Sequence, residues 1–319
     1  MFCQKAKTLY YWYKHFLSDY FPDIEEGKWC SEKIELVDKN TGEIKEKPLY
    51  VFKPENVGAN MSIDDKAIGR DGFTILSNSH SGKIALMVES TTSEGVEKAM
   101  EKFGRDALDK IKNVSMDMSP VYALAINDLV PRAVHVIDKF HVMKYVYGSV
   151  CDVRSRIVKE LRQQLSKGKK RTEEDKNLLS QIEHLRRVSH AITQSSDKWS
   201  EEMKGTVNQI FVKHNELKTA YGVSQKLKRW YDYQNHTDSM DTITQNLHAW
   251  YKEAMVISEF EGVIKMLRKH ETEIINFFKN GLTNAKAERL NGKIQRFISA
   301  NYGIKDRDFF LYRTAKYFS

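Results

Sequence analysis

The sequence predicts an α/β protein with a mixed sheet and a large all-helical insertion. Short apolar runs alternate with helical patterns up to residue 138, helical periodicity without strand signals follows to about residue 278, and two amphipathic helices end the chain. We therefore expect four segments: an N-terminal helical or linker region over 1–59, the first part of the sheet domain over 60–142, the insertion over 143–280, and C-terminal helices over 281–319 that complete the sheet domain.

The first three strands of the sheet are predicted to be antiparallel neighbours. They have the sequences MSIDD, GFTILSN and KIALMVES, over 61–65, 72–78 and 83–90. The polar, glycine-containing NSHSG between the last two is typical of a hairpin loop. The following TTSEGVEKAMEKF predicts a helix over 91–103, with Ser93 as its cap.

Two further strands are separated by a helix. NVSMD predicts a strand that ends at Asp117, SPVYALAINDL a helix with Pro120 in its first turn, and AVHVID a strand that ends at Asp138. Right-handed crossovers between parallel strands are strongly preferred. We therefore expect both strands to run parallel to the first strand, in a mixed sheet with helices on its faces.

Composition limits the class of partner and the compartment. The 319 residues carry a formal net charge of +8, which favours an anionic partner such as nucleic acid. Cys3, Cys30 and Cys151 are far apart, which argues against a disulfide framework or a zinc site. No apolar run approaches the roughly 18 residues of a membrane helix, and the N-terminus lacks the apolar core of a signal peptide. We expect a soluble protein of a reducing cytoplasm without a membrane partner.

Carboxylates stand at two strand ends. Asp117 and Asp138 each follow an apolar strand and precede a helical pattern. An aspartate in such a position can simply cap the helix by accepting backbone N–H bonds. The alternative is functional: carboxylates from neighbouring strand ends, together with one from a helix, could form a pocket for divalent metal ions.

The helix within GLTNAKAERLNGKIQRFISANYG supplies a third carboxylate. It carries apolar, polar and basic stripes: Leu290, Ile294, Phe297 and Ile298; Glu288, Asn291 and Gln295; Lys286, Arg289, Lys293 and Arg296. This pattern predicts that Glu288 lies at the border of the core. The simpler interpretation is a surface residue paired with its basic neighbours along the helix.

Four blocks together resemble a known family. MSIDD, VSMDMSPVYALAINDLVPRAVHVIDKFHV, LTNAKAERLNGKIQRF and the D-x-D-F-F pattern of residues 306–310 resemble the DDE transposases of bacterial insertion sequences, in particular the ISL-type group with its D-K/R-F-H-V signature. The resemblance covers most of residues 55–319. It implies a ribonuclease-H-like catalytic domain with a helical insertion before the last catalytic helix, and an enzyme of DNA recombination that moves a mobile element.

The resemblance also implies a site. The three catalytic and metal-binding carboxylates fall on Asp64, Asp117 and Glu288. The expected cofactor is Mg²⁺ or Mn²⁺, as two ions. This chain has Asp65 where relatives usually show Glu, and Asp64 and Asp65 should point to opposite faces of their strand, so only one can meet Asp117. We choose Asp64. The implied auxiliary residues are Asp138, His141 and Asn291, although a helix cap with a packed histidine would equally explain the first two.

Basic and aromatic residues give further candidates for DNA contact. The basic stripe of Lys286, Arg289, Lys293 and Arg296 is one, and the loop with Lys169, Lys170 and Arg171 is another, unless it is only a solvated connection. Five aromatic residues could stack on a base, but their helical spacing favours a core position: Trp199, Trp230, Tyr231, Trp250 and Tyr251.

The expected partner is double-stranded DNA, both as element ends and as target. Residues 1–59 show no convincing DNA-binding motif, so a separate N-terminal DNA-binding polypeptide could supply end recognition. A homodimer or higher oligomer would synapse two ends. Two alternatives to an active transposase remain. One is a ribonuclease-H-like nuclease that cuts DNA without joining strands, and the other is an inactive transposase relic that only binds DNA. The intact acidic set argues against the relic.

Overall fold

The computed structural model describes residues 6–38, 41–166, 172–233, 239–279, 285–301 and 306–319, with side chains for all of these except residues 6, 233, 285–288 and 291. The chain forms two compact units. The first contains Met1–Val136 with Thr283–Ser319, and the second Ile137–Leu282. Each unit is described separately below.

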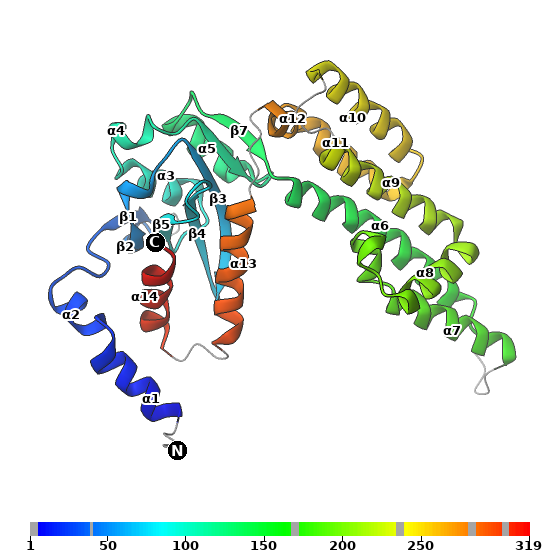
Figure 1. The fold of residues 1–319 in the computed structure, drawn as a ribbon, viewed down its shortest axis with the longest axis horizontal. Coiled ribbons are helices and arrows are strands. Elements are labelled where there is room, and N and C mark those ends of the chain that lie inside the picture. The colour runs from blue at the N-terminus through cyan, green and yellow to red at the C-terminus, as the bar shows by residue number, and fades with distance from the viewer. Residues whose placement is uncertain (1–5, 39–40, 167–171, 234–238, 280–284, 302–305) are drawn as a thin grey trace. The chain divides into compact units, whose positions relative to one another are not determined.

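The first unit is built on a mixed sheet of seven strands in its described residues (Figure 1). In chain order the strands are β1 (Lys33–Val37), β2 (Ile44–Phe52), β3 (Asn60–Ile68), β4 (Asp71–Asn78), β5 (Ile84–Val88), β6 (Asn113–Met116) and β7 (Val134–Ile137). Their order across the sheet is β1-β2-β5-β4-β3-β6-β7. The pairs from β1 to β3 are antiparallel, whereas β3 and β6 are parallel. The predicted α/β class and the predicted antiparallel set β3, β4 and β5 are therefore confirmed.

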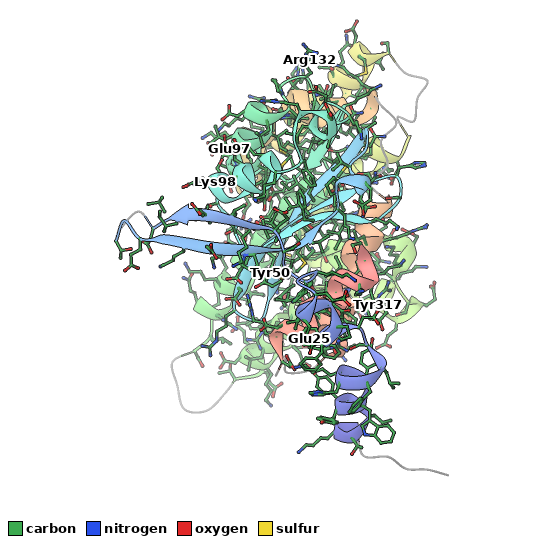
Figure 2. All side chains as sticks on the ribbon, turned by 90° about the vertical axis from the view of Figure 1, so that its left-hand side faces the viewer. Glu25, Tyr50, Glu97, Lys98, Arg132 and Tyr317 are labelled. Atoms are coloured by element: carbon green, nitrogen blue, oxygen red, sulfur yellow. The ribbon has the colours of Figure 1, made fainter. Side chains whose placement is uncertain are left out.

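Strands β1 and β2 are additions to the predicted sheet. Residues 1–59 were expected to be helical or linker, and they do contain helical segments, but β1 and β2 extend the sheet through pairing of β2 with β5. The pattern failed because β2 does not alternate: Ile44–Glu46 are exposed in succession and Leu49–Val51 are buried in succession, and β1 is only five residues long. Figure 2 shows the ribbon extending from the body of the unit.

Helices of the first unit cover both faces of the sheet. The helical segments in the described residues of this unit are α1 (Ala6–Trp12), a π-helical turn (Tyr13–Leu17), α2 (Tyr20–Glu25), a 3₁₀ turn (Pro54–Asn56), α3 (Ser93–Glu101), α4 (Arg105–Leu108), α5 (Pro120–Leu129), α13 (Ala285–Ala300) and α14 (Arg307–Phe318), and α3, α5, α13 and α14 contribute to the clusters on the sheet faces. Pro120 stands in the first turn of α5, as predicted. The cap of α3 was predicted wrongly. Thr92, not Ser93, accepts the Gly95 N–H, because Thr92 has the extended backbone of a cap and Ser93 is already helical.

Two apolar clusters hold these layers together. On one face, Met61 and Ile63 of β3 pack with residues of α3 and α5, including Met100 and Tyr122. On the other, Ile75 of β4 belongs to a cluster formed with the two C-terminal helices: Leu290, Ile294, Phe310 and Leu311. The end of α14, which carries Tyr317 (Figure 2), also meets the N-terminal helical segments. The Tyr317 hydroxyl lies 3.1 Å from that of Tyr13.

The second unit is helical throughout its described residues after β7. Its α-helices are α6 (Lys139–Gln163), α7 (Glu173–Arg187), α8 (Glu201–Lys213), α9 (Asn215–Tyr233), α10 (Met240–Ala254), α11 (Glu261–Lys269) and α12 (Glu271–Lys279). Short 3₁₀ turns lie at Ala191–Thr193, Ser196–Lys198 and Ser258–Phe260. Buried Trp and Tyr side chains fill its core.

Candidate active site

Strand β3 turns its two aspartates to opposite faces of the sheet. Met61 and Ile63 lie in the cluster that α3 and α5 cover, and Asp65 continues their side of the strand. Asp65 accepts a hydrogen bond from the Tyr122 hydroxyl of α5, which places it on that face. Asp64 and Ile68 alternate with these residues, and Ile68 packs in the cluster with α13 and α14. Asp64 therefore lies on the face that α13 covers.

The register of β6 against β3 predicts the position of Asp117. The parallel register pairs Met61 with Val114 and Ser62 with Ser115, and its continuation by two residues would pair Asp64 with Asp117. Val114 belongs to the cluster with α3 and α5, so by alternation Asp117 would lie on the same face as Asp64. Neighbouring strands are about 4.8 Å apart. Strand β6 ends at Met116, so continuing the register only predicts that Asp64 and Asp117 are neighbours.

The Asp64 carboxylate is held by its neighbours along β3. One oxygen accepts a hydrogen bond from the Asp65 N–H at 2.9 Å, and the other accepts one from the Lys66 ammonium at 3.0 Å. The Asp64 and Lys66 side chains are each 18% exposed. Asp117 accepts the Ser119 N–H at 2.8 Å, which shapes the turn into α5. Lys66 therefore partly neutralises the charge of Asp64.

Asp65 belongs to a separate polar network. In addition to the Tyr122 hydroxyl, it accepts the Thr74 hydroxyl at 3.3 Å, and Thr74 also reaches the Ser90 carbonyl oxygen at 2.6 Å. Burial of the Asp65 carboxylate, followed by the charges of Asp117 and Asp64, raises its pKa to about 6, although the Thr74 hydrogen bond acts in the opposite direction. The charges of Asp117 and Asp64 are thus close enough to raise the pKa of Asp65.

This shift predicts a pH-dependent stability difference. Because the pKa of Asp65 is raised above its ordinary 3.8, the folded chain binds more protons than the unfolded chain between about pH 4 and 6, and the wild type loses stability as pH rises through that window. Asp65→Asn lacks this loss. Urea unfolding in chelator-containing buffer should show the free energy of unfolding of the variant rising relative to the wild type from pH 4 to 6.5. A constant difference would contradict the shift.

Helix α13 carries the third candidate carboxylate. The predicted apolar stripe is confirmed, since Leu290 and Ile294 are buried and Phe297 and Ile298 pack against the same cluster. The Glu288 side chain lies outside the described residues, as do those of Asn291 and Lys286. Within the described side chains, no group of three His, Cys, Asp or Glu residues could hold a metal ion. The structure thus places Asp64 on the face that α13 covers and the backbone of Glu288 in that helix, and the continued β3–β6 register predicts Asp117 on the same face.

The auxiliary candidates Asp138 and His141 lie at the start of α6, in the second unit. Asp138 is buried, and its carboxylate accepts the Phe140 N–H at 3.0 Å as the cap of α6. The His141 ring is half-buried and meets the Phe140 ring edge-on, with centroids 5.5 Å apart. The helix cap weighed from the sequence is therefore present.

Of the basic candidates, Arg289, Lys293 and Arg296 are exposed along α13. Lys169, Lys170 and Arg171 lie outside the described residues. The aromatic candidates of the second unit form its core, as expected: Trp199, Trp230, Tyr231, Trp250 and Tyr251 are all buried. Three indole N–H groups donate to backbone carbonyls, including Trp250 to Val223 at 2.9 Å.

Sequence reasoning missed the close neighbours of the aspartates. Lys66 lies two residues after Asp64, so the alternation of a strand could have found it on the same face. Tyr122 and Thr74 carried no comparable signal, because only the packing of α5 on the sheet brings them to Asp65.

Comparison with known proteins agrees with this geometry. A family model described as Transposase, for DDE transposases of the ISL3 type, matches residues 61–314. No curated protein and no solved structure matches the chain. In the described residues, no helix is long and apolar enough to cross a membrane. The match spans most of the chain and includes Asp64, Asp117 and Glu288. The chain therefore belongs to the ISL3-type DDE transposase family.

Proposed function

We propose that this chain catalyses metal-dependent cleavage and strand transfer of the DNA of an insertion sequence, with Asp64, Asp117 and Glu288 as its catalytic carboxylates. One observation supports the assignment of residues: the parallel register of β3 and β6, continued by two residues, would align Asp64 with Asp117 on the sheet face that α13 covers. Asp65 points to the opposite face and is engaged by Tyr122.

We interpret the sheet as ribonuclease-H-like. The order of three antiparallel strands, a helix, a parallel strand, a helix and an edge strand supports this interpretation, as do helices on both faces. In this interpretation, α6 to α12 are an insertion between the second aspartate and the glutamate. It separates Asp117 from Glu288 in the sequence and leaves α13 to return to the sheet (Figure 1).

The donor set suits Mg²⁺ or Mn²⁺. Carboxylate oxygens are hard ligands, and two aspartates side by side with a glutamate from α13 could hold a pair of ions while leaving room for water and phosphate oxygens. When bound, such ions would activate the attacking oxygen and stabilise charge on the leaving oxygen. The hydrogen bonds from Asp65 N–H and Ser119 N–H orient the two aspartate side chains.

The substrate class follows from the family and from charge. Transposases act on DNA, and the exposed Arg289, Lys293 and Arg296 of α13 offer cations next to the proposed site. Such residues bind phosphates without regard to sequence. Recognition of the element's ends would then come from a separate polypeptide or a further segment, and synapsis of two ends from at least two copies of the chain.

Duplex DNA that spans the end of the element tests the proposal. We expect Mg²⁺- or Mn²⁺-dependent nicks at the end and joined products, both reduced about 10²-fold or more in Glu288→Gln, because the amide supplies no negative charge. Products would be mapped at nucleotide resolution, with and without candidate upstream polypeptides. Glu101→Gln, which makes the same substitution at an exposed position of α3 in the same unit, is the control for the removed charge.

Each alternative has its own outcome in this assay. Metal-dependent cleavage without joining would identify a nuclease and overturn strand transfer. Binding of DNA without either reaction, also with the upstream polypeptide present, would identify an inactive relic.

A further inference from the structure

A basic pocket lies in the second unit, between α6 and α7. Its volume is about 340 Å³, and six residues line it: Arg154, Ser155, Val158, Lys159, Arg162 and Arg186. Four of the six are cations, and none is acidic. Neither the candidate active site nor the predicted DNA-binding residues include any of them.

The charge of this pocket is not neutralised by the protein around it. Among the described residues, no carboxylate lies within ion-pair distance of the four cations, and Lys159, Arg162 and Arg186 are exposed. Arg156, on the same helix, differs completely: its guanidinium pairs with Glu160, Glu216 and Glu259 at 2.7 to 3.0 Å. On α6, therefore, Arg156 is paired with carboxylates, whereas the cations that line the pocket are not.

Arg154 is fixed in the pocket wall. One terminal nitrogen donates to the Leu185 carbonyl oxygen of α7 at 3.4 Å and the other to the Ser155 hydroxyl at 3.5 Å. Its Nε is buried and has no hydrogen-bond partner within the described part of the chain. A guanidinium held in this way keeps its position and retains donor capacity.

Helix ends explain only part of this arrangement. Arg162 and Arg186 lie in the last turns of α6 and α7, where a cation stabilises the partial negative charge of the helix C-terminus. Lys159 lies before the last turn of α6, and Arg154 lies in the middle of that helix. Helix-end electrostatics therefore does not explain Lys159 or Arg154, although Arg154 also links α6 to the Leu185 carbonyl of α7.

We propose that this pocket binds backbone phosphates of duplex DNA, as a second contact that is separate from the candidate active site. The inference rests on the proposed function. Arg154, Val158 and Arg162 follow one another at intervals of four residues, so the cations span about 12 Å of α6. That length matches about three phosphates along one DNA strand and favours an extended polyanion over a single phosphate ion.

Salt-dependent binding by the full chain tests this contact. The variant is Lys159→Gln with Arg162→Gln. Its control is Lys252→Gln with Lys269→Gln, which removes the same net charge from exposed positions on α10 and α11 of the same unit (Figure 1). We expect the pocket variant to bind nonspecific duplex about tenfold more weakly and to lower the slope of log K against log salt by about 2, whereas the control changes neither appreciably.

A footprint on the wild type avoids any effect of substitution on folding. Lysine acylation followed by mass spectrometry should show Lys159 protected by duplex DNA and Lys252 not protected. Equal slopes for the two double variants, or an unprotected Lys159 in a complex that forms, would overturn the pocket contact and leave the proposed function intact. A wild type that binds no DNA would overturn both. A pocket variant that melts early but still binds with the wild-type slope would assign these cations to the helix ends.

Discussion

Asp64→Asn is expected to reduce DNA nicking and joining by at least about 10³-fold, and Asp117→Asn by a similar factor, because each change removes a charged ligand from the proposed site. Asp65→Asn should retain most activity. The reason is geometric. In our proposal the continued register aligns Asp64 with Asp117 on the face covered by α13, whereas Asp65 faces α5 and accepts hydrogen bonds from the Tyr122 and Thr74 hydroxyls.

The three variants are matched, since each replaces an aspartate with its neutral isostere within one local cluster. Single-turnover rates on a pre-nicked and an intact element end would separate joining from cleavage. Folding is checked by thermal unfolding, and DNA binding at low salt should survive in all three. An inactive Asp65→Asn beside an active Asp64→Asn would exchange their roles and refute the register argument.

Trp250→Ala should lower the free energy of unfolding by about 3–5 kcal/mol, the usual cost of truncating a large buried aromatic side chain. The Trp250 side chain is only 5% exposed, packs with Tyr251 and Phe260, and donates its indole N–H to the Val223 carbonyl at 2.9 Å. Removal of the ring would leave a cavity and an unsatisfied carbonyl in the helical unit.

Trp250→Phe separates the contribution of the ring from that of the hydrogen bond. It keeps most of the apolar ring and loses the hydrogen bond, so the expected cost is smaller, about 1–2 kcal/mol including the lost volume. Because the ring is buried, neither its loss nor its replacement should alter the contacts of DNA with the folded chain. Denaturant unfolding and DNA titration under native conditions would be measured together. Weaker DNA binding by a fully folded Trp250→Phe would show instead that the ring stacks on a base.

The local pattern of apolar and turn residues determined much of the secondary structure of this protein. Apolar runs bounded by turn residues predicted β3, β4 and β5, and helical spacing predicted α3, α5 and the buried stripe of α13. These elements have one strongly buried face, and burial imposes a period that single residues reveal. The same alternation predicted that only one of Asp64 and Asp65 could meet Asp117.

Only the tertiary structure decided how β1 and β2 join the sheet, because their pairing is nonlocal and their exposed side chains carry little periodic signal. It also decided which aspartate faces α13, since the choice depends on which helices cover each side of β3. The contacts of Asp65 with Tyr122 and the basic pocket between α6 and α7 have the same origin. They join residues that are distant in sequence, and spacing along a chain does not encode such contacts until the elements pack.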